Sequence, residues 1–416
     1  MNNLIYQIDG RPPFGKLILF AVQLMLSVFV ATVLIANICG VAVSGALVGA
    51  GLSTLAYVLI TGGKSPMFLS SSGAFVAPVI AALTMGGYTA VAIGSVVAGL
   101  IYCLFGILFK FIPVEKIYNI FPKALIGAVT VVIGINLMPF ILTYVQIGGV
   151  TNGWGIFIMF VTMFAIAAFS HYGKGIIQIL PFLLGTLIGY GIAVILTLTG
   201  IYPIVDFSVF KDLTLFSMPE FAFTRFIPID SAIIIPVIIL YIAYTISAMM
   251  ECLSDHAALG GIIGTDLYET PGLSRIFFGQ GIANALNGFI GALGICSYGE
   301  GVACVGFSKV AATRVTAVAA IILAALGFIA PVQAFIASIP SCVFAGAAII
   351  LYGFIACSGV KMLQSVDLNN QKNLIIVSSV LSLGISGITL GNGNISLTAT
   401  ALALTAGVIF NRILKE

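Results

Sequence analysis

The nine residues "CSYGEGVAC" (296–304) place a carboxylate between two glycines inside a long apolar region of the chain. Gly299 and Gly301 both weaken a helix, so this stretch gives up helix propensity where Glu300 carries its charge. A related stretch, "SSGAFVA" (71–77), lies in the first half of the chain. It matches "SYGEGVA" at its serine, its glycine, its valine and its final alanine. The sequence therefore repeats a helix-weakening pattern in its two halves.

The composition restricts the chain to one broad class of protein. Of its 416 residues, 61% are hydrophobic and only 7% are charged, which is too little polar surface for a soluble protein of this length. The apolar residues form repeated runs of about 20, the length that a helix needs to cross about 30 Å of hydrocarbon. Backbone groups in lipid must be satisfied within the segment, and the alternating pattern of a membrane barrel is absent. The sequence predicts an all-α polytopic membrane protein.

Fourteen apolar segments are predicted as membrane spans, with one long connection between the seventh and the eighth. The polar residues before the first span are not expected to form a cleavable signal, because the first apolar run is long enough to remain as a span. The spans lie near residues 17–38, 42–62, 67–85, 88–111, 122–145, 154–171, 175–199, 231–257, 277–294, 296–312, 314–335, 341–359, 373–389 and 395–412.

The positions of the basic residues support this count and predict an orientation. If the N-terminus is cytoplasmic, all but two of the 16 Lys and Arg residues fall on the cytoplasmic side, as the positive-inside rule predicts. The two exceptions, Lys211 and Arg225, lie in the connection 200–230. The residues on the cytoplasmic side are Arg11, Lys16, Lys64, Lys110, Lys116, Lys123, Lys174, Arg275, Lys309, Arg314, Lys361, Lys372, Arg412 and Lys415. We expect a multi-pass protein of the cell (inner) membrane with both termini in the cytoplasm.

The two matching stretches predict an inverted repeat. "SSGAFVA" falls in the third span and "SYGEGVA" in the tenth, and an offset of seven spans gives the two halves opposite topology. Inverted repeats are typical of secondary transporters, whose sites lie near the bilayer midplane where helices are interrupted. Gly73 and Gly299 would let the backbone unwind beside a cavity. Alternatively, these small residues only allow helices to pack closely.

Three carboxylates lie within predicted spans. Glu251 and Asp255 are in the eighth span, and Glu300 is in the tenth. A charge at a helix centre costs about 2.5–3.5 kcal/mol, so such residues usually face a cavity and have a function. Glu251 and Asp255 are four residues apart and share a helix face, where they cannot easily both ionise, so one is expected to hold a proton. Alternatively, the span ends earlier and leaves Asp255 in water, and His256 is expected to be interfacial.

Other kinds of site are not indicated. The seven cysteines have no paired spacing, which argues against a disulfide framework and against a metal site. The sequence contains no nucleophile–base set and no metal-ligand spacing. We therefore expect no enzyme activity, no catalytic residue, no metal, no resident cofactor and no nucleic-acid partner.

Nearly the whole chain resembles the nucleobase–ascorbate transporter family, and within it the bacterial uracil permeases. The resemblance lies in "RPPFGKLILFAVQLMLSVFVATVL" for the first span, "SSSGAFVAP" for the third, "TPGLSRIFFGQGIANALNGFIGALGICSYGEGVACVGFSKV" for the eighth to tenth, and "IPSCVFAGAAIILYGFIACSGVKML" for the twelfth. The family signature reads here as Glu300, Gly301, Val302 and Ala303, followed after a variable stretch by Ser308 and Lys309.

The resemblance implies how the chain divides. Two inverted sets of seven spans would form a core domain and a gate domain, and the gate would also make the contact of a homodimer. Short antiparallel strands in the third and tenth spans would meet at the site. The core would comprise residues 1–112 (spans one to four) and 231–336 (spans eight to eleven), and the gate 113–230 (spans five to seven) and 337–416 (spans twelve to fourteen).

The resemblance also implies site residues. Glu251 and Glu300 match the glutamates that contact the base in uracil permeases, and Gly73 and Gly299 match strand positions whose amides assist. The candidate substrate-binding residues are Gly73, Ala74, Phe75, Glu251, Tyr298, Gly299 and Glu300. The candidates for proton coupling are Glu251, Asp255 and Glu300. Tyr352, which alone would be read as a packing residue, is the candidate gate residue.

Several departures from the family pattern leave the substrate open. Gly73 stands where Phe is usual, so an apolar wall is missing or is supplied by Phe75. The signature Asn is Gly301 and its Gly is Ala303. Asp255 replaces the His of uracil permeases, as in the purine-transporting members. Glu at the start of the signature favours uracil, whereas Asp255 and Gly73 favour a xanthine-like base.

The combined prediction is proton-coupled uptake (symport) of a small-molecule nucleobase across the lipid bilayer. Uracil is the first choice, xanthine or uric acid is the alternative, and sodium is the alternative coupling ion. An anion transporter of similar architecture would need a cation at the site, where the spans offer no Lys or Arg. A channel would use Glu300 and Asp255 as an acidic ring.

Overall fold

Helices form most of the chain in the computed structural model, as the long apolar runs predict. The structure describes residues 4–111, 116, 119, 121–147, 150–174, 177, 180–211, 213–388, 390–392, 395–397 and 399–414. The helices of the first half are α1 (Phe14–Cys39), α2 (Val43–Ile60), α3 (Val76–Phe111), α5 (Lys123–Leu137), α6 (Phe140–Val145), α7 (Gly153–Tyr172) and α9 (Pro181–Leu198). Those of the second half are α10 (Ser231–Ile263), α11 (Leu273–Ile290), α12 (Gly299–Ser308), α13 (Thr313–Leu326), α14 (Ala330–Ser338), α15 (Ser341–Leu363), α16 (Gln371–Ile385) and α17 (Ala399–Ile413).

Short elements interrupt or connect these helices. The strands are β1 (Leu69–Ser71), β2 (Gln146–Ile147), β3 (Val150–Thr151), β4 (Ile295–Ser297), β5 (Leu390–Asn392) and β6 (Ile395–Leu397). The single turns of helix are η1 (Gly73–Phe75), η2 (Ser208–Phe210), η3 (Ala222–Arg225) and η4 (Tyr268–Gly272). The hairpins β2–β3 and β5–β6 were not predicted from the sequence.

The predicted fold class is confirmed. Among the described residues, 7 helices are long and apolar enough to cross a membrane, and shorter apolar helices cover most of the remaining predicted spans. One of the seven, Gly73–Phe111, contains two predicted spans, which are separated by a break at Gly86 and Gly87. Gly87 has φ 62° and ψ −152°, a conformation that essentially only glycine adopts. The start of the predicted seventh span at 175, and Lys415, lie outside the described residues.

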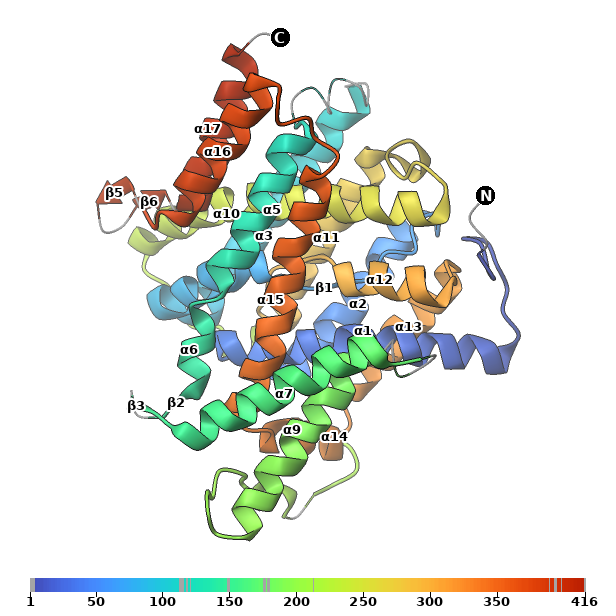
Figure 1. The fold of residues 1–416 in the computed structure, drawn as a ribbon, viewed down its shortest axis with the longest axis vertical. Helices are drawn as coiled ribbons and strands as arrows, with labels where there is room; N and C mark the ends of the chain where they lie inside the picture. The colour runs from blue at the N-terminus through green and yellow to red at the C-terminus, as the bar shows by residue number, and fades with distance from the viewer. Residues whose placement is uncertain are drawn as a thin grey trace.

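The helices pack as two bundles that each combine both halves of the chain. The strand-containing bundle consists of α1, α2, α3, α10, α11, α12 and α13 with β1 and β4, and the flanking bundle consists of α5, α7, α9, α15, α16 and α17. In the first bundle α3 packs on α11 while α2 packs on α13, an exchange of partners that an inverted repeat predicts. In Figure 1, α7 with α9 and α16 with α17 lie at opposite ends of the molecule, with α15 between them.

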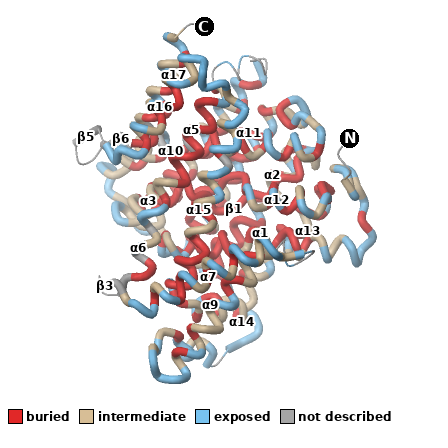
Figure 2. The backbone as a smooth tube through the Cα atoms, viewed as in Figure 1, coloured by how far each residue is buried: buried red, intermediate tan, exposed pale blue. Residues whose placement is uncertain are grey.

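Burial follows the same arrangement. Buried residues concentrate around β1, α1, α2 and α15, whereas the connection after α9 is largely exposed (Figure 2). Many exposed side chains on the outer helices are nevertheless large and apolar, such as Leu100 at 64% and Phe164 at 63% exposure. Such an apolar exterior fits hydrocarbon as the surrounding solvent.

The two short strands pair antiparallel at the centre of the strand-containing bundle, as predicted for the third and tenth spans. Leu69 faces Ser297, and Ser71 faces Ile295. The sequence repeat has an offset of 226 residues, since Ser71 matches Ser297. Adding this offset to Leu69 gives Ile295, and subtracting it from Ser297 gives Ser71, so exchanging the two halves turns the first pair into the second and leaves the register unchanged.

Candidate functional site

A cavity of about 510 Å³ lies where the strand pair meets the flanking bundle. Its size is typical of small-molecule sites. The strand-containing bundle lines it with Ser71, Gly73, Glu251, Asp255, Tyr298, Gly299 and Glu300, among others. The flanking bundle lines it with Thr130, Ser170, Leu180, Pro181, Phe182, Leu183, Leu351, Tyr352 and further residues of α15.

Each carboxylate of α10 accepts a hydrogen bond from a serine beside one of the two strands. The Ser72 hydroxyl donates to Glu251 Oε2 at 2.8 Å, and the Ser297 hydroxyl donates to Asp255 Oδ2 at 2.7 Å. Ser72 also accepts from the Ala74 N–H at 3.1 Å, which caps η1. The serines thereby orient both acids with respect to the strand pair.

Glu300 completes a group of three acids. It lies in the first turn of α12, where the positive end of the helix dipole favours a negative group. It lines the same cavity as Glu251 and Asp255. Several like charges in a poorly solvated place cannot all be carried at once without a compensating cation or proton.

The two strand-end glycines have different surroundings. Gly299 is open to the cavity, and a Cβ built there would meet only Asp255 Oδ1, at 3.7 Å. A Cβ at Gly73 would lie 2.7 Å from Leu137 Cδ1 on α5. Gly73 therefore lies where the two bundles touch, and Gly299 borders the space available to a ligand.

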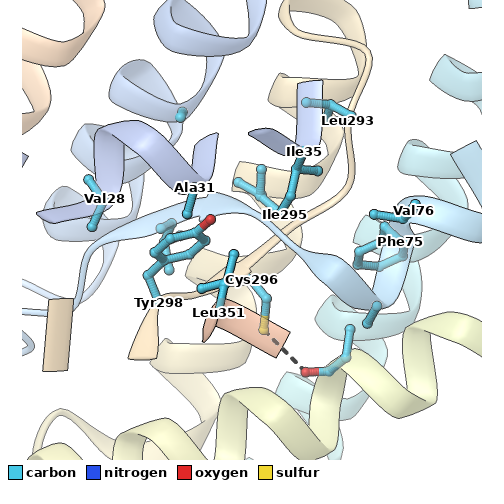
Figure 3. Packing of buried hydrophobic residues seen from close by; sticks show 14 of the residues in the cluster. Val28, Ala31, Ile35, Phe75, Val76, Leu293, Ile295, Cys296, Tyr298 and Leu351 are labelled. Atoms are coloured by element: carbon cyan, nitrogen blue, oxygen red, sulfur yellow. Dashed lines mark hydrogen bonds between the residues drawn. The ribbon is translucent and has the colours of Figure 1, made fainter. Parts of the chain in front are cut away.

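Of three predicted aromatic and apolar site residues, Tyr298 lies at the cavity, whereas Ala74 and Phe75 belong to the hydrophobic core. Tyr298 lines the cavity together with Leu351, and Figure 3 shows its ring well apart from Phe75. Ala74 and Phe75 are not among the lining residues. The Phe75 ring instead stacks on Tyr241, with 6.0 Å between the ring centroids, so the apolar wall expected from Phe75 is not found there.

Three hydroxyl groups at the cavity have no hydrogen-bond partner within the described part of the chain. They belong to Ser71, Ser170 and Tyr352, and all three are buried side-chain atoms. Tyr352 was predicted as the gate residue and Ser71 lies in the predicted interruption of the third span, whereas Ser170 was not selected from the sequence. Unpaired buried hydroxyls are costly, so these groups are available to a ligand.

One expectation about α10 is wrong. His256 is fully buried rather than interfacial: its Nδ1 donates to the Cys252 carbonyl at 2.7 Å, and its Nε2 lies 2.7 Å from the Tyr57 hydroxyl. The reason is that α10 continues to Ile263, beyond the predicted end of the span. Asp255 borders the cavity, so the alternative that left it in open water does not hold.

The expectation that no Lys or Arg would border the site is also wrong. Lys361 lines the cavity from the last turn of α15, because this helix extends past the predicted end at 359. Among the described residues, no group of three or more His, Cys, Asp or Glu side chains is placed to hold a metal ion.

Comparison with known proteins gives consistent matches over most of the chain. A family model described as the Permease family matches residues 15–393. The uracil permease of Paenibacillus larvae subsp. larvae is 32% identical over 431 residues, covering 100% of this chain and 99% of that protein. The uracil permease of Bacillus caldolyticus is 32% identical, covering 100% and 95%. The putative pyrimidine permease RutG of Escherichia coli is 31% identical, covering 98% and 91%.

Solved structures share the fold at low sequence identity. The transmembrane domain of the cyanobacterial bicarbonate transporter BicA superposes with a TM-score of 0.62 at 16% identity, covering 97% of this chain and 100% of that chain. SLC26A9 superposes with a TM-score of 0.68 at 11% identity, covering 97% and 66%.

Proposed function

Because this chain belongs to the permease family, we propose that it is a secondary active transporter that takes up a nucleobase together with a cation. Uracil is the proposed substrate, since relatives named uracil permeases match this chain from end to end. Xanthine or uric acid is the second candidate, favoured by Asp255 and by the missing side chain at Gly73.

The observation that carries this proposal is the meeting of three carboxyl groups and two strand ends at one cavity. The edge of a pyrimidine or oxopurine alternates N–H donors with C=O acceptors. Glu251 and Glu300 can accept from the N–H groups. The hydroxyls of Ser71 and Tyr352, together with backbone N–H groups near Gly299, can donate to the C=O groups.

Coupling to a cation follows from the crowding of like charges. Glu251, Asp255 and Glu300 line one cavity, and uptake of a proton there would relieve the repulsion between like charges. If the base binds best when one acid is protonated, proton and base stabilise the same state, which is thermodynamic coupling. The proton is the proposed ion, and sodium is the alternative, because carboxylates also suit that ion.

The lining residues indicate from which side the cavity opens. From the strand ends they continue along α10 to Ala258, along α12 to Phe307 and along α15 to Lys361. In the predicted orientation, all three helices run from the outside towards the cytoplasm. We therefore assign the structure to a cytoplasm-facing state of a protein in the cell membrane with cytoplasmic termini.

Transport would then require the two bundles to move against each other around the cavity that they share. The proposed moving units are the predicted core (1–112 and 231–336) and gate (113–230 and 337–416), with a homodimer formed through the gate. The anion transporters of similar fold share 16% identity or less, so they support the architecture alone. The acids at the strand ends argue against an anionic substrate.

The test is uptake of radiolabelled uracil into proteoliposomes. A pH gradient, acidic outside, should drive accumulation, and a sodium gradient at equal pH should not. Competition by unlabelled xanthine, uric acid, hypoxanthine and adenine would rank the bases. Accumulation of xanthine but not uracil would select the second candidate, and no gradient-driven uptake of any base would refute the proposal.

Glu300→Gln provides the matching variant. It keeps the size of the side chain but removes the charge and the titrating proton, so proton-driven accumulation should fall at least tenfold. Glu269→Gln, an equal change at an exposed residue of η4, should leave uptake unchanged. Full proton-driven uptake by Glu300→Gln would remove this residue from the mechanism.

A further inference from the structure

A two-stranded ribbon inside a membrane protein has two outer edges that need hydrogen-bond partners. The inner edges of β1 and β4 bond to each other, and the ladder continues with Tyr298 N–H to the Phe68 carbonyl at 3.1 Å and Ser72 N–H to the Gly294 carbonyl at 3.0 Å. In antiparallel pairs, alternate residues direct their N–H and C=O groups outward. Unpaired backbone groups are costly where water is absent.

On β1 the outward-directed residues are Leu69 and Ser71, and one threonine satisfies both backbone groups of Leu69. The Thr54 hydroxyl on α2 donates to the Leu69 carbonyl at 2.8 Å and accepts from the Leu69 N–H at 3.1 Å. Both residues are fully buried. Thr54 thus replaces the neighbouring strand that this edge lacks.

On β4 the corresponding residue is Ile295, and two amides of α11 perform the same task. Asn284 accepts from the Ile295 N–H at 3.0 Å and donates to the Ile295 carbonyl at 2.9 Å. Gln280 donates to the same carbonyl at 2.9 Å. Both amides are fully buried and belong to none of the cavity walls, so contact with a ligand does not explain them.

The two edges are related by the sequence repeat. The offset of 226 residues that takes Ser71 to Ser297 also takes Leu69 to Ile295, and it takes Thr54 to Gln280. A polar side chain from the second helix of each half therefore holds the first residue of that half's strand.

The middle residue of each strand is held as well. The Ser70 hydroxyl lies 2.7 Å from that of Thr32 on α1, and the Cys296 thiol donates to the Ala248 carbonyl of α10 at 3.2 Å. Figure 3 shows the Cys296 contact as a dashed line. The ribbon is thus fixed from both sides by helices of both halves.

We propose that Thr54, Gln280 and Asn284 are positioning residues that hold the strand pair so that Ser72 and Ser297 present Glu251 and Asp255 to the substrate. This inference rests on the proposed function. Ser72 lies three residues beyond Leu69, and Ser297 lies two residues beyond Ile295, so a loosened edge displaces the hydroxyl that orients each acid.

The test compares variants that remove an edge bond with variants that remove an equivalent bond elsewhere. Thr54→Val and Asn284→Leu remove edge bonds. Thr162→Val removes a buried threonine bond to the carbonyl of Ile158 on its own helix, and Asn136→Leu removes an amide of α5 that donates to the Gly384 carbonyl and to the Thr400 hydroxyl. Thr54→Ser keeps the hydroxyl and serves as the rescue.

The first readout is amide hydrogen exchange of the unliganded full-length protein. Thr54→Val and Asn284→Leu should each accelerate exchange at least tenfold in both strands, because a strand that loses its edge also loosens its partner. Thr162→Val and Asn136→Leu should leave strand exchange unchanged. Equal exchange in all four variants would overturn the proposal, whatever the substrate of the protein.

The second readout is binding and transport of the base preferred by the wild type. Edge variants should raise the apparent KM about tenfold, with Thr54→Ser near the wild type and control variants unaffected. A fall in maximal rate with unchanged KM would overturn the positioning role. If the wild type binds no base, the proposed function fails and the exchange experiment alone decides the inference. If Asn284→Leu does not fold, Gln280→Leu removes a single bond to the same edge.

Discussion

At the residue scale, Glu251 and Asp255 are each held by a serine hydroxyl, and within the described part of the chain neither acid forms a salt bridge. A serine O–H can donate to a carboxylate and equally to the carbonyl oxygen of a protonated carboxyl group. Ser72 and Ser297 therefore orient Glu251 and Asp255 without fixing them in the charged form. A lysine or arginine in the same place would stabilise the charged form strongly. The arrangement suits acids that must gain and lose a proton during a cycle.

Asp255→Asn tests this distinction. The amide keeps the size of the side chain and an oxygen that can accept from Ser297, but it cannot carry a proton. We expect binding and exchange of labelled for unlabelled base to remain within a few fold of the wild type, while accumulation driven by a pH gradient falls at least tenfold. Counterflow and gradient-driven uptake, measured on the same proteoliposomes, separate the two effects.

The control for this change lies at the other end of the same helix. Asp230 caps α10, where its Oδ1 accepts from the Ala232 N–H at 3.0 Å. Asparagine caps helices as well as aspartate does, so Asp230→Asn should leave folding and uptake unchanged. Wild-type accumulation by Asp255→Asn would show that Asp255 carries no coupled proton.

The sequence was informative about isolated charges and much less so about their partners. Glu251, Asp255 and Glu300 could be selected because a charged residue in an apolar span is energetically costly and usually has a function. The hydrogen bonds from Ser72 and Ser297 to these acids could not be predicted, because they join residues 179 and 42 positions apart and depend on the strand register. Whether the acids bind substrate stays a prediction.

At the element scale, the break between the two spans within α3 depends on one backbone conformation. Gly87 has a positive φ, which is strained for a residue with a side chain, whereas Gly86 has a negative φ of −154°. Gly87→Ala should therefore lower the free energy of unfolding by about 1–3 kcal/mol. Thermal unfolding of the purified protein in detergent measures this as a lower Tm.

The comparison variant is Gly191→Ala in the middle of α9, where an added Cβ meets no atom within 4 Å. Alanine is a better helix former than glycine by about 1 kcal/mol, so this change should raise the Tm or leave it unchanged. A Tm for Gly87→Ala equal to that of the wild type would show that the break tolerates side chains.

The presence of the helices and of the interruptions was more predictable than the helix ends and the strand register. Apolar runs predicted the spans, and the repeated serine–glycine pattern predicted interruptions in the third and tenth spans. The register of β1 with β4 was not predictable, because it depends on how α2 and α11 hold Leu69 and Ile295. The ends of α10 and α15 were misplaced for a related reason: both helices continue past the apolar run into polar residues.

At the scale of the whole molecule, Gly73 and Leu137 bring the two bundles into contact. Gly73→Ala places a methyl group 2.7 Å from the Leu137 side chain, so it should hinder movement between the bundles. We expect a severalfold lower maximal rate of uptake, restored by adding Leu137→Ala. Gly299→Ala, where the nearest atom is 3.7 Å away, should not depend on Leu137. Equal rates for Gly73→Ala with and without Leu137→Ala would contradict this account.

The direction in which the cavity opens can be tested with Cys357. This cysteine is exposed and lines the cavity on α15, whereas Cys39, Cys252, Cys296, Cys304 and Cys342 are buried. A membrane-impermeant maleimide should label Cys357 in inside-out vesicles and not in right-side-out vesicles, and added base should slow the labelling. Cys357→Ser identifies the signal. Labelling only from the outer side would reverse the proposed orientation.

The strand pair also imposes an order of events during synthesis. β1 leaves the ribosome long before β4, since 226 residues separate Leu69 from Ile295. Until β4 is synthesised, the inner edge of β1 has no strand to pair with. The first half of the chain is then in the bilayer with unpaired backbone groups at its centre. A polypeptide that stops after α9 would insert helices yet enclose no pocket. The two halves, made as separate polypeptides, would restore the pocket only by finding each other within one membrane.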